Sequence, residues 1–227
     1  MGKLIVIEGL DGSGKGTQAA LLAEYLRGRG CRVREISFPD YESEGSVLVK
    51  MYLDGKLGDN PDDTNAYAAS MFYAADRYVS YRTDWEKDYL DPDTVVIANR
   101  YTTANAYHQL SKLPEEQWDG YLQWLFDFEY RLIGIPAPDS VIYLKVDPAI
   151  SQQLMTGRYH GEEAKKDIHE KDVEFISRCH ESAMDAAFAM DWKVVACASM
   201  GGLAVRPAEQ IHKDVWEAVK EVIERDE

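Results

Sequence analysis

The sequence predicts an α/β fold in which a five-stranded parallel sheet carries helices on both faces. Five short apolar segments typical of buried strands recur along the chain, at residues 3–9, 31–38, 93–101, 139–147 and 192–198. Helical patterns separate these segments, and strands that alternate with helices form right-handed βαβ units around a parallel sheet. A glycine-rich loop follows the first strand, at the edge of the sheet where ligands of such folds bind.

The first strand and the first helix are the clearest elements. The run "KLIVIEG" (3–9) is continuous and rich in β-branched residues, which is typical of a strand buried on both faces. The pattern over 15–30 has apolar residues at helical spacing and ends in glycines, a common helix stop. Further helical patterns cover 61–89, 103–110, 115–132, 148–155, 170–190 and 207–225.

One segment, at about 156–172, contains almost no large apolar side chains. Such a segment buries little surface, so we expect a mobile flap or an exposed helix hairpin that serves as a small lid. The chain shows no internal repeat or linker. The sequence therefore predicts a single domain over 1–227 with this lid.

Composition restricts the classes of partner. The 227 residues carry a net charge of −15, which argues against binding of a nucleic-acid polymer but not of a mononucleotide. An odd number of widely spaced cysteines predicts free thiols in a reducing compartment. No apolar run is long enough to span a membrane. We expect a cytoplasmic protein.

The loop "GLDGSGKGT" (9–17) has the features of a phosphate-binding loop. Its glycines let backbone N–H groups point inward, and the next helix adds the partial positive charge of its N-terminus. Lys15 supplies a full charge for terminal phosphates. The pattern predicts a P-loop NTPase fold that binds a nucleoside triphosphate, and the one we expect is ATP. The expected ATP-binding residues are Gly9, Leu10, Asp11, Gly12, Ser13, Gly14, Lys15, Gly16 and Thr17.

Gly16 departs from the usual pattern, which has Ser or Thr after the lysine to reach magnesium. Adenylate kinases carry the same "GKGT", and Thr17 remains one position later. Magnesium in such sites is held largely by phosphates and water. We therefore expect Mg²⁺ to bind together with ATP, and we assign it no protein ligand.

Several stretches together resemble the thymidylate kinases. "IEGLDGSGK" resembles the family's opening F-E-G-x-D-G-x-G-K, whereas adenylate kinases usually have Pro-Gly in this part of the loop. Agreement continues in "SFPDY" (37–41), "MFYAADR" (71–77), "NRYTTANAYHQ" (99–109) and "PDSVIYLKVDP" (138–148). The resemblance covers most of the chain and implies transfer of the γ-phosphoryl group of ATP to dTMP.

The resemblance also implies an acceptor site. In the family, the loop Asp faces the 3′-hydroxyl of the acceptor, the helix aromatic stacks on thymine and the following Arg bonds the base. The Arg of the Asp-Arg-Tyr stretch grips the acceptor phosphate, and an amide from Asn105 or Gln109 reads thymine. The implied residues are Asp11, Phe38, Tyr41, Tyr73, Arg77, Arg100, Asn105 and Gln109.

Asn99 replaces the Asp of the family's Asp-Arg-Tyr. An amide is neither a base nor an anion. The acceptor phosphate is already largely dianionic at neutral pH, because its second pKa is about 6. We expect Asn99 to keep the geometry of the site while Asp11 and Glu8 supply its acidic character.

The lid also departs from the family. Some members carry an Arg after the loop Asp, but this chain has Gly12, so we expect the cation to come from the lid. Arg158 is the first candidate, with Lys165 and Lys166 behind it, and Ile168 stands where the family's lid has an Arg. The expected catalytic residues are Lys15, Arg100, Arg158 and Asp11.

Two alternatives stay open. A kinase for another nucleotide or nucleoside would keep the phosphate loop but lack the base-site residues. A nucleotide-binding protein without catalytic activity would explain Gly16 and Asn99 together. The family forms homodimers, and the aromatic-rich patterns near 66–81 and 121–132 suit either such an interface or intramolecular packing. The sequence does not distinguish dTMP from dUMP.

Overall fold

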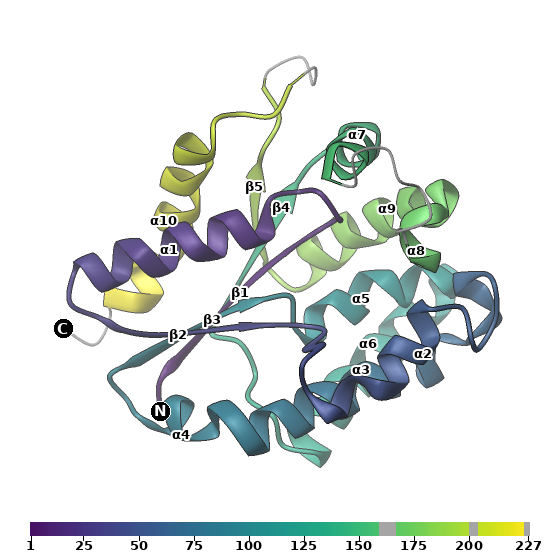
Figure 1. The fold of residues 1–227 in the computed structure, drawn as a ribbon, viewed down its shortest axis with the longest axis horizontal. Coiled ribbons are helices and arrows are strands. Elements are labelled where there is room, and N and C mark those ends of the chain that lie inside the picture. The colour runs from purple at the N-terminus through teal and green to yellow at the C-terminus, as the bar shows by residue number, and fades with distance from the viewer. Residues whose placement is uncertain (159–166, 200–203, 225–227) are drawn as a thin grey trace.

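The computed structural model describes residues 1–158, 167–199 and 204–224. Its five strands form one sheet in the order β2-β3-β1-β4-β5. Every neighbouring pair is parallel, which confirms the predicted sheet (Figure 1). The strands are β1 (Lys3–Gly9), β2 (Arg32–Ser37), β3 (Thr94–Asn99), β4 (Ser140–Lys145) and β5 (Lys193–Ala196).

The sheet separates two hydrophobic cores because side chains alternate between its faces. Leu4 and Val6 of β1 belong to one core, and Ile5 and Ile7 belong to the other. Figure 1 shows α1 and α10 together on one side of the sheet, with α3 to α6 on the other. Both faces are therefore covered by helices, as predicted.

The helices are α1 (Lys15–Gly28), α2 (Val47–Leu53), α3 (Ala66–Ser80), α4 (Glu86–Leu90), α5 (Asn105–His108), α6 (Trp118–Phe126), α7 (Pro148–Arg158), α8 (Ile168–Lys171), α9 (Val173–Ala189) and α10 (Ala208–Glu224). Short 3₁₀ turns join several of them. Two π-helical turns, η3 (Tyr81–Trp85) and η7 (Asp127–Leu132), directly continue α3 and α6.

The helix predicted over 61–89 starts later in the structure and contains a π-helical turn. Helix α3 begins only at Ala66, because the side chain of Asn65 accepts a hydrogen bond from the backbone N–H of Ala68 (2.9 Å) and caps the helix. The π-helical turn η3 then joins α3 directly to α4, so helical backbone continues to Leu90. Helix α2, whose seven residues follow a 3₁₀ turn, was not predicted.

The expectation of an exposed lid is wrong for its C-terminal end. Helix α8 lies there, and Ile168, His169 and Glu170 are all buried. Ile168 packs into a small apolar cluster with Tyr52 and other residues of α2 and α3, so one well-placed apolar side chain anchors this end. Residues 159–166 lie outside the described structure. None of the described helices is long and apolar enough to cross a membrane.

Candidate active site

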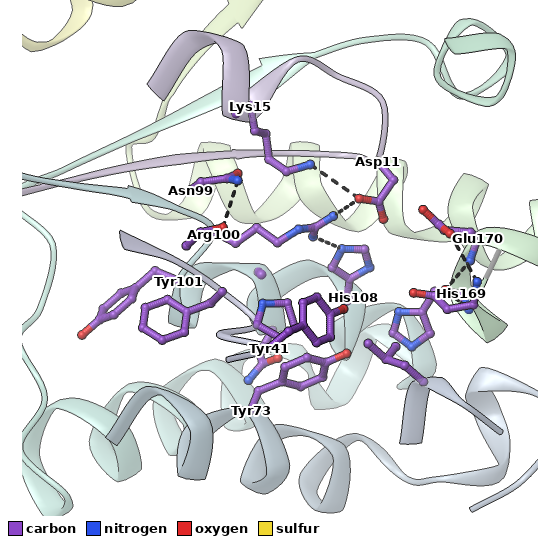
Figure 2. Close-up of a pocket in the computed structure, with 18 of the residues that line it drawn as sticks. Asp11, Lys15, Tyr41, Tyr73, Asn99, Arg100, Tyr101, His108, His169 and Glu170 are labelled. Atoms are coloured by element: carbon purple, nitrogen blue, oxygen red, sulfur yellow. Dashed lines mark hydrogen bonds and ion pairs between the residues drawn. The ribbon is translucent and has the colours of Figure 1, made fainter. Parts of the chain in front are cut away.

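A cavity of about 560 Å³ lies beyond the carboxyl ends of β1, β2 and β3. Side chains from the phosphate loop, α3, the segment after β3, and α8 converge on it (Figure 2). The sequence-predicted residues that line it are Asp11, Gly12, Gly14, Lys15, Gly16, Thr17, Phe38, Tyr41, Tyr73, Arg77, Arg100, Asn105 and Gln109. Of the remaining predicted loop residues, Gly9, Leu10 and Ser13 shape the loop without lining the cavity.

Glycines give the phosphate loop backbone conformations that other residues rarely adopt. Gly12 (φ 81°) and Gly14 (φ 90°) adopt left-handed backbone conformations that other residues rarely tolerate. Gly14 directly precedes α1 and offers no side-chain cap, so the first N–H groups of this helix have no side-chain acceptor at its N-cap. A helix N-terminus of this kind is suited to bind phosphate.

Asp11 lies between two cations. Its Oδ1 accepts a hydrogen bond from Nη2 of Arg100 and lies 3.7 Å from Nζ of Lys15. Burial by itself would raise the pKa of Asp11, but the charges of Arg100 and Lys15 outweigh this effect and hold the pKa below its ordinary value. Asp11 is therefore an anion throughout the neutral range.

Arg100 enters the cavity from the end of β3 with an unusual backbone conformation. Its φ is +67°, which is costly for a residue with a Cβ and is often found at functional sites. Its Nη1 lies 2.9 Å from Nε2 of His108 and 3.5 Å from the hydroxyl of Tyr107. Because Arg only donates, Nε2 of His108 must accept. Asp11 and His108 thus fix the guanidinium from two directions.

His108 was missed by the sequence analysis, although a signal was present. Asn105, His108 and Gln109 follow the i, i+3, i+4 spacing of one helix face. All three line the cavity, from the short helix α5 and its C-cap residue Gln109. Burial, reinforced by the charge of Arg100, lowers the pKa of His108 well below its ordinary value. The ring is therefore neutral, as its role as an acceptor requires.

One side of the cavity carries unsatisfied amide groups. Nδ2 of Asn105 and both polar side-chain atoms of Gln109 are buried and have no hydrogen-bond partner in the described structure. Tyr73 and Arg77 line the same cavity from α3, and Figure 2 places Tyr73 opposite Lys15. Buried amides without partners are costly unless a ligand satisfies them. This end therefore suits a flat ligand with both hydrogen-bond donors and acceptors.

Glu8 has a different place from the one expected. Its carboxylate is fully buried, does not line the cavity, and accepts three hydrogen bonds, from Tyr101 N (2.9 Å), Thr103 Oγ1 (2.7 Å) and Tyr107 Oη (2.9 Å). Burial raises its pKa. Glu8 anchors the segment that follows β3 beneath the site, so the acidity of the cavity wall in this region comes from Asp11.

Helix α8 and its N-cap residue add three polar residues that sequence reasoning did not assign to the site: Asp167, His169 and Glu170. Burial, with the carboxylates of Asp11 and Glu170 nearby, raises the pKa of Asp167 to about 7. Asp167 also accepts hydrogen bonds from the backbone N–H groups of the other two residues (2.8 and 2.9 Å). The described end of the lid therefore forms part of the wall.

The side chains of the expected lid cations lie outside the described structure. Helix α7 ends at Arg158, but the position of its side chain is not described, and Lys165 and Lys166 lie outside the described residues. Within the described residues, no three His, Cys, Asp or Glu side chains form a metal-binding group. Oδ1 of Asn99 is buried beside the phosphate loop without a partner. This acceptor fits a water of a magnesium ion that arrives with nucleotide.

Comparisons with known proteins agree on one family. The family model described as "Thymidylate kinase" matches residues 7–205. A thymidylate kinase of Mycobacterium tuberculosis is 29% identical over 177 residues, which cover 77% of this chain and 81% of that protein. That of Plasmodium falciparum is 30% identical over 226 residues, covering 97% and 90%. The solved structure of a Candida albicans thymidylate kinase superimposes with a TM-score of 0.69 at 20% identity, covering 97% and 92%.

Proposed function

The chain belongs to the thymidylate kinase family. We propose that the protein transfers the γ-phosphoryl group of ATP to dTMP in this cavity, giving dTDP and ADP. ATP binds over the loop 9–17. The acceptor lies across the strand ends, with its base between α3 and α5 and its phosphate near Arg100. The cavity volume of about 560 Å³ is in the range of ligand-binding sites.

The chain's charged side chains act by positioning. Phosphoryl transfer needs in-line alignment and charge neutralisation more than covalent chemistry. Lys15 neutralises the donor phosphates, and Arg100, held by Asp11 and His108, holds the acceptor phosphate. The ionised Asp11 accepts a hydrogen bond from the 3′-hydroxyl of the acceptor. Phe38, which is buried against Tyr101, forms the adjoining wall.

Base recognition rests on the aromatic and amide groups. Tyr73 stacks on the thymine ring, an interaction worth about 1–3 kcal/mol. Arg77 and the amides of Asn105 and Gln109 hydrogen-bond its edge. The observation that carries the proposal is that these amides are buried without partners, because a base with carbonyl and imide groups satisfies both donors and acceptors.

Magnesium and the lid complete the proposed site. When bound with ATP, Mg²⁺ supplies further neutralisation of phosphate charge. Oδ1 of Asn99 would accept a hydrogen bond from a water bound to that ion. Tyr41, half exposed on the cavity wall, reaches the acceptor phosphate. Arg158, at the end of α7, brings a second arginine to the transferring group when the part of the lid that precedes α8 closes and excludes water.

The test is production of ADP with ATP and Mg²⁺ against dTMP, dUMP, dCMP, AMP, GMP and thymidine. Turnover on dTMP well above the others is expected. Preference for another acceptor would be consistent with ATP binding at the phosphate loop, but it would contradict the assignment of the thymine-binding residues. Binding of ATP without turnover on any acceptor would favour the non-catalytic alternative, which Gly16 and Asn99 motivate.

We further propose a cytoplasmic homodimer. Tyr67, Met71 and Tyr78 lie on one face of α3 with 41–48% of their surface exposed, although Tyr67 also packs against Trp124 within the chain. A second copy that covers this face would bury the apolar stripe. Sedimentation of the protein and of Met71→Glu, which should shift the dimer toward monomer, tests this. The free cysteines support a reducing compartment.

A further inference from the structure

A single carboxylate determines the orientation of Arg77. Arg77 and Glu129 have exposed side-chain fractions of 2% and 0%. Nε of Arg77 donates to Oε2 of Glu129 (2.7 Å), and Nη2 donates to Oε1 (2.6 Å), which makes a bidentate pair. In the described structure, Nη1 has one long contact, 3.5 Å to the carbonyl oxygen of Tyr101. Nη1 is therefore the nitrogen left to donate strongly to a ligand.

Glu129 itself does not line the cavity, whereas Arg77 does. Oε2 of Glu129 also accepts a hydrogen bond from Thr102 Oγ1 (2.8 Å). Thr102 lies two residues after Arg100, so the carboxylate joins α3 to the segment that carries the phosphate-binding arginine. Glu129 thus contacts both α3, which carries Arg77, and the segment after β3, without itself lining the cavity.

The π-helical turn η7 explains how Glu129 comes to face inward. A π-turn adds one residue to the helical repeat and shifts the side chains that follow, and such turns recur at functional sites. Asp127 and Arg131 on the same turn pair with each other at the surface (2.8 Å between Oδ2 and Nη2). Glu129, between them, is fully buried. Of the two acidic residues in η7, Glu129 therefore faces the interior and Asp127 faces the surface.

We propose that Glu129 is a positioning residue for nucleobase recognition: it holds Nε and Nη2 of Arg77 so that Nη1 donates to a carbonyl oxygen of the acceptor's base. This inference rests on the proposed function. The isolated buried charge of Arg77 would be unstable without a partner. The carboxylate of Glu129 more than offsets the lowering of the pKa of Arg77 by burial, so Arg77 keeps its proton.

The test compares Glu129→Asp and Glu129→Gln with Asp127→Asn as the matched control, because Asp127 is an acidic residue of the same turn whose ion pair is exposed. Dissociation constants for dTMP and for ATP are measured by calorimetry, well below the melting temperature of each variant. Glu129→Asp keeps a negative charge beside Arg77, but its shorter side chain cannot hold both nitrogens as before.

Loss of a hydrogen bond from a charged group predicts a rise of about tenfold or more in the Kd for dTMP in both Glu129 variants. The Kd for ATP should stay within about twofold, as should both constants in Asp127→Asn. If the Glu129 variants only melt earlier while their Kd for dTMP is unchanged, the positioning role is overturned and the proposed function stands. Wild-type protein that does not bind dTMP overturns both.

Discussion

Gly16 and Asn99 are neighbours at the junction of the phosphate loop and β3. A Cβ atom placed on Gly16 would lie 3.8 Å from Nδ2 of Asn99, an ordinary contact distance. Nδ2 donates to Ser37 Oγ (3.1 Å), while Oδ1 is buried without a partner. Gly16, which departs from the usual phosphate-loop pattern, and Asn99, which departs from the family's Asp-Arg-Tyr, therefore lie side by side on the cavity wall. They are expected to act on the same bound group.

The first prediction concerns Gly16→Ser. The space beside Asn99 admits the new side chain, and Ser is a better helix former than Gly, so stability should stay equal or rise by about 0.5 kcal/mol. The hydroxyl can reach a magnesium ion bound with ATP. One added ligand worth about 1 kcal/mol should lower the Mg²⁺ concentration for half-maximal turnover about fivefold. Gly16→Ala is the control, since it fills the space without a ligand; an equal effect of both variants would contradict the explanation.

The second prediction concerns His108. His108→Phe keeps the ring that stacks near His169 and Phe175 but removes the acceptor for Arg100. The KM for dTMP should rise about tenfold, the effect of a lost hydrogen bond to a charged group. His108→Gln restores an acceptor and should recover part of the loss. Steady-state kinetics with dTMP as the varied substrate decide this, and a wild-type KM in His108→Phe would remove the contact from substrate binding.

Parts of this molecule were predictable because their signals are local. The strand 3–9, its loop and the start of α1 follow from a continuous apolar run, glycine positions and a lysine at fixed spacing. The parallel sheet follows from the alternation of strands and helices.

What sequence reasoning missed depends on contacts across the fold. Glu129 meets Arg77 from 52 residues away, through a π-turn that no sequence pattern indicates. Ile168 looked like part of a polar lid, yet it packs on α2, a helix that was itself not predicted. His108 is the exception, because its helical spacing from Asn105 could have indicated it.

The third prediction concerns the close packing of the segment 38–46, which carries Phe38 and Tyr41. A Cβ on Gly45 would lie 2.8 Å from Cβ of Val79 in α3. Gly45→Ala should therefore destabilise the protein by about 1–3 kcal/mol, and it should also raise the KM for dTMP because the segment shifts. Gly120→Ala is the matched control. It meets nothing within 4 Å on α6 and should stabilise by about 0.5–1 kcal/mol. Urea unfolding measures the stability of both variants. Equal stabilities of Gly45→Ala and Gly120→Ala would contradict the packing argument.

The fourth prediction concerns the lid. Arg158→Ala should lower kcat by roughly 10², the effect of losing one preorganised donor at the transferring group, with little change in the KM for dTMP. Lys165→Ala should cost less, because an ammonium does not form the bidentate contact of an arginine. Near-normal turnover of Arg158→Ala would remove Arg158 from the mechanism.

The last prediction is a pH dependence that comes from Asp167. Its pKa rises from an ordinary value of 3.8 to about 7 in the folded protein, chiefly because it is buried. Between these values the folded state holds a proton that the unfolded state has lost. The contribution of this proton to the free energy of unfolding is fully present below pH 4. It is lost as the pH rises toward 7, at no more than about 1.4 kcal/mol per pH unit.

Asp167→Asn removes this titration but keeps an N-cap acceptor for α8. Urea unfolding at pH 5 and pH 7.5 should therefore show that the wild-type protein loses more stability than the variant on going to the higher pH. Asp76, whose pKa rises to about 6 for the same reason, is present in both proteins and cancels in the comparison. Because an ionised Asp167 also repels the acceptor's phosphate, the variant should have the lower KM for dTMP at pH 7.5. Parallel pH profiles of the two proteins would show that Asp167 titrates near its ordinary value.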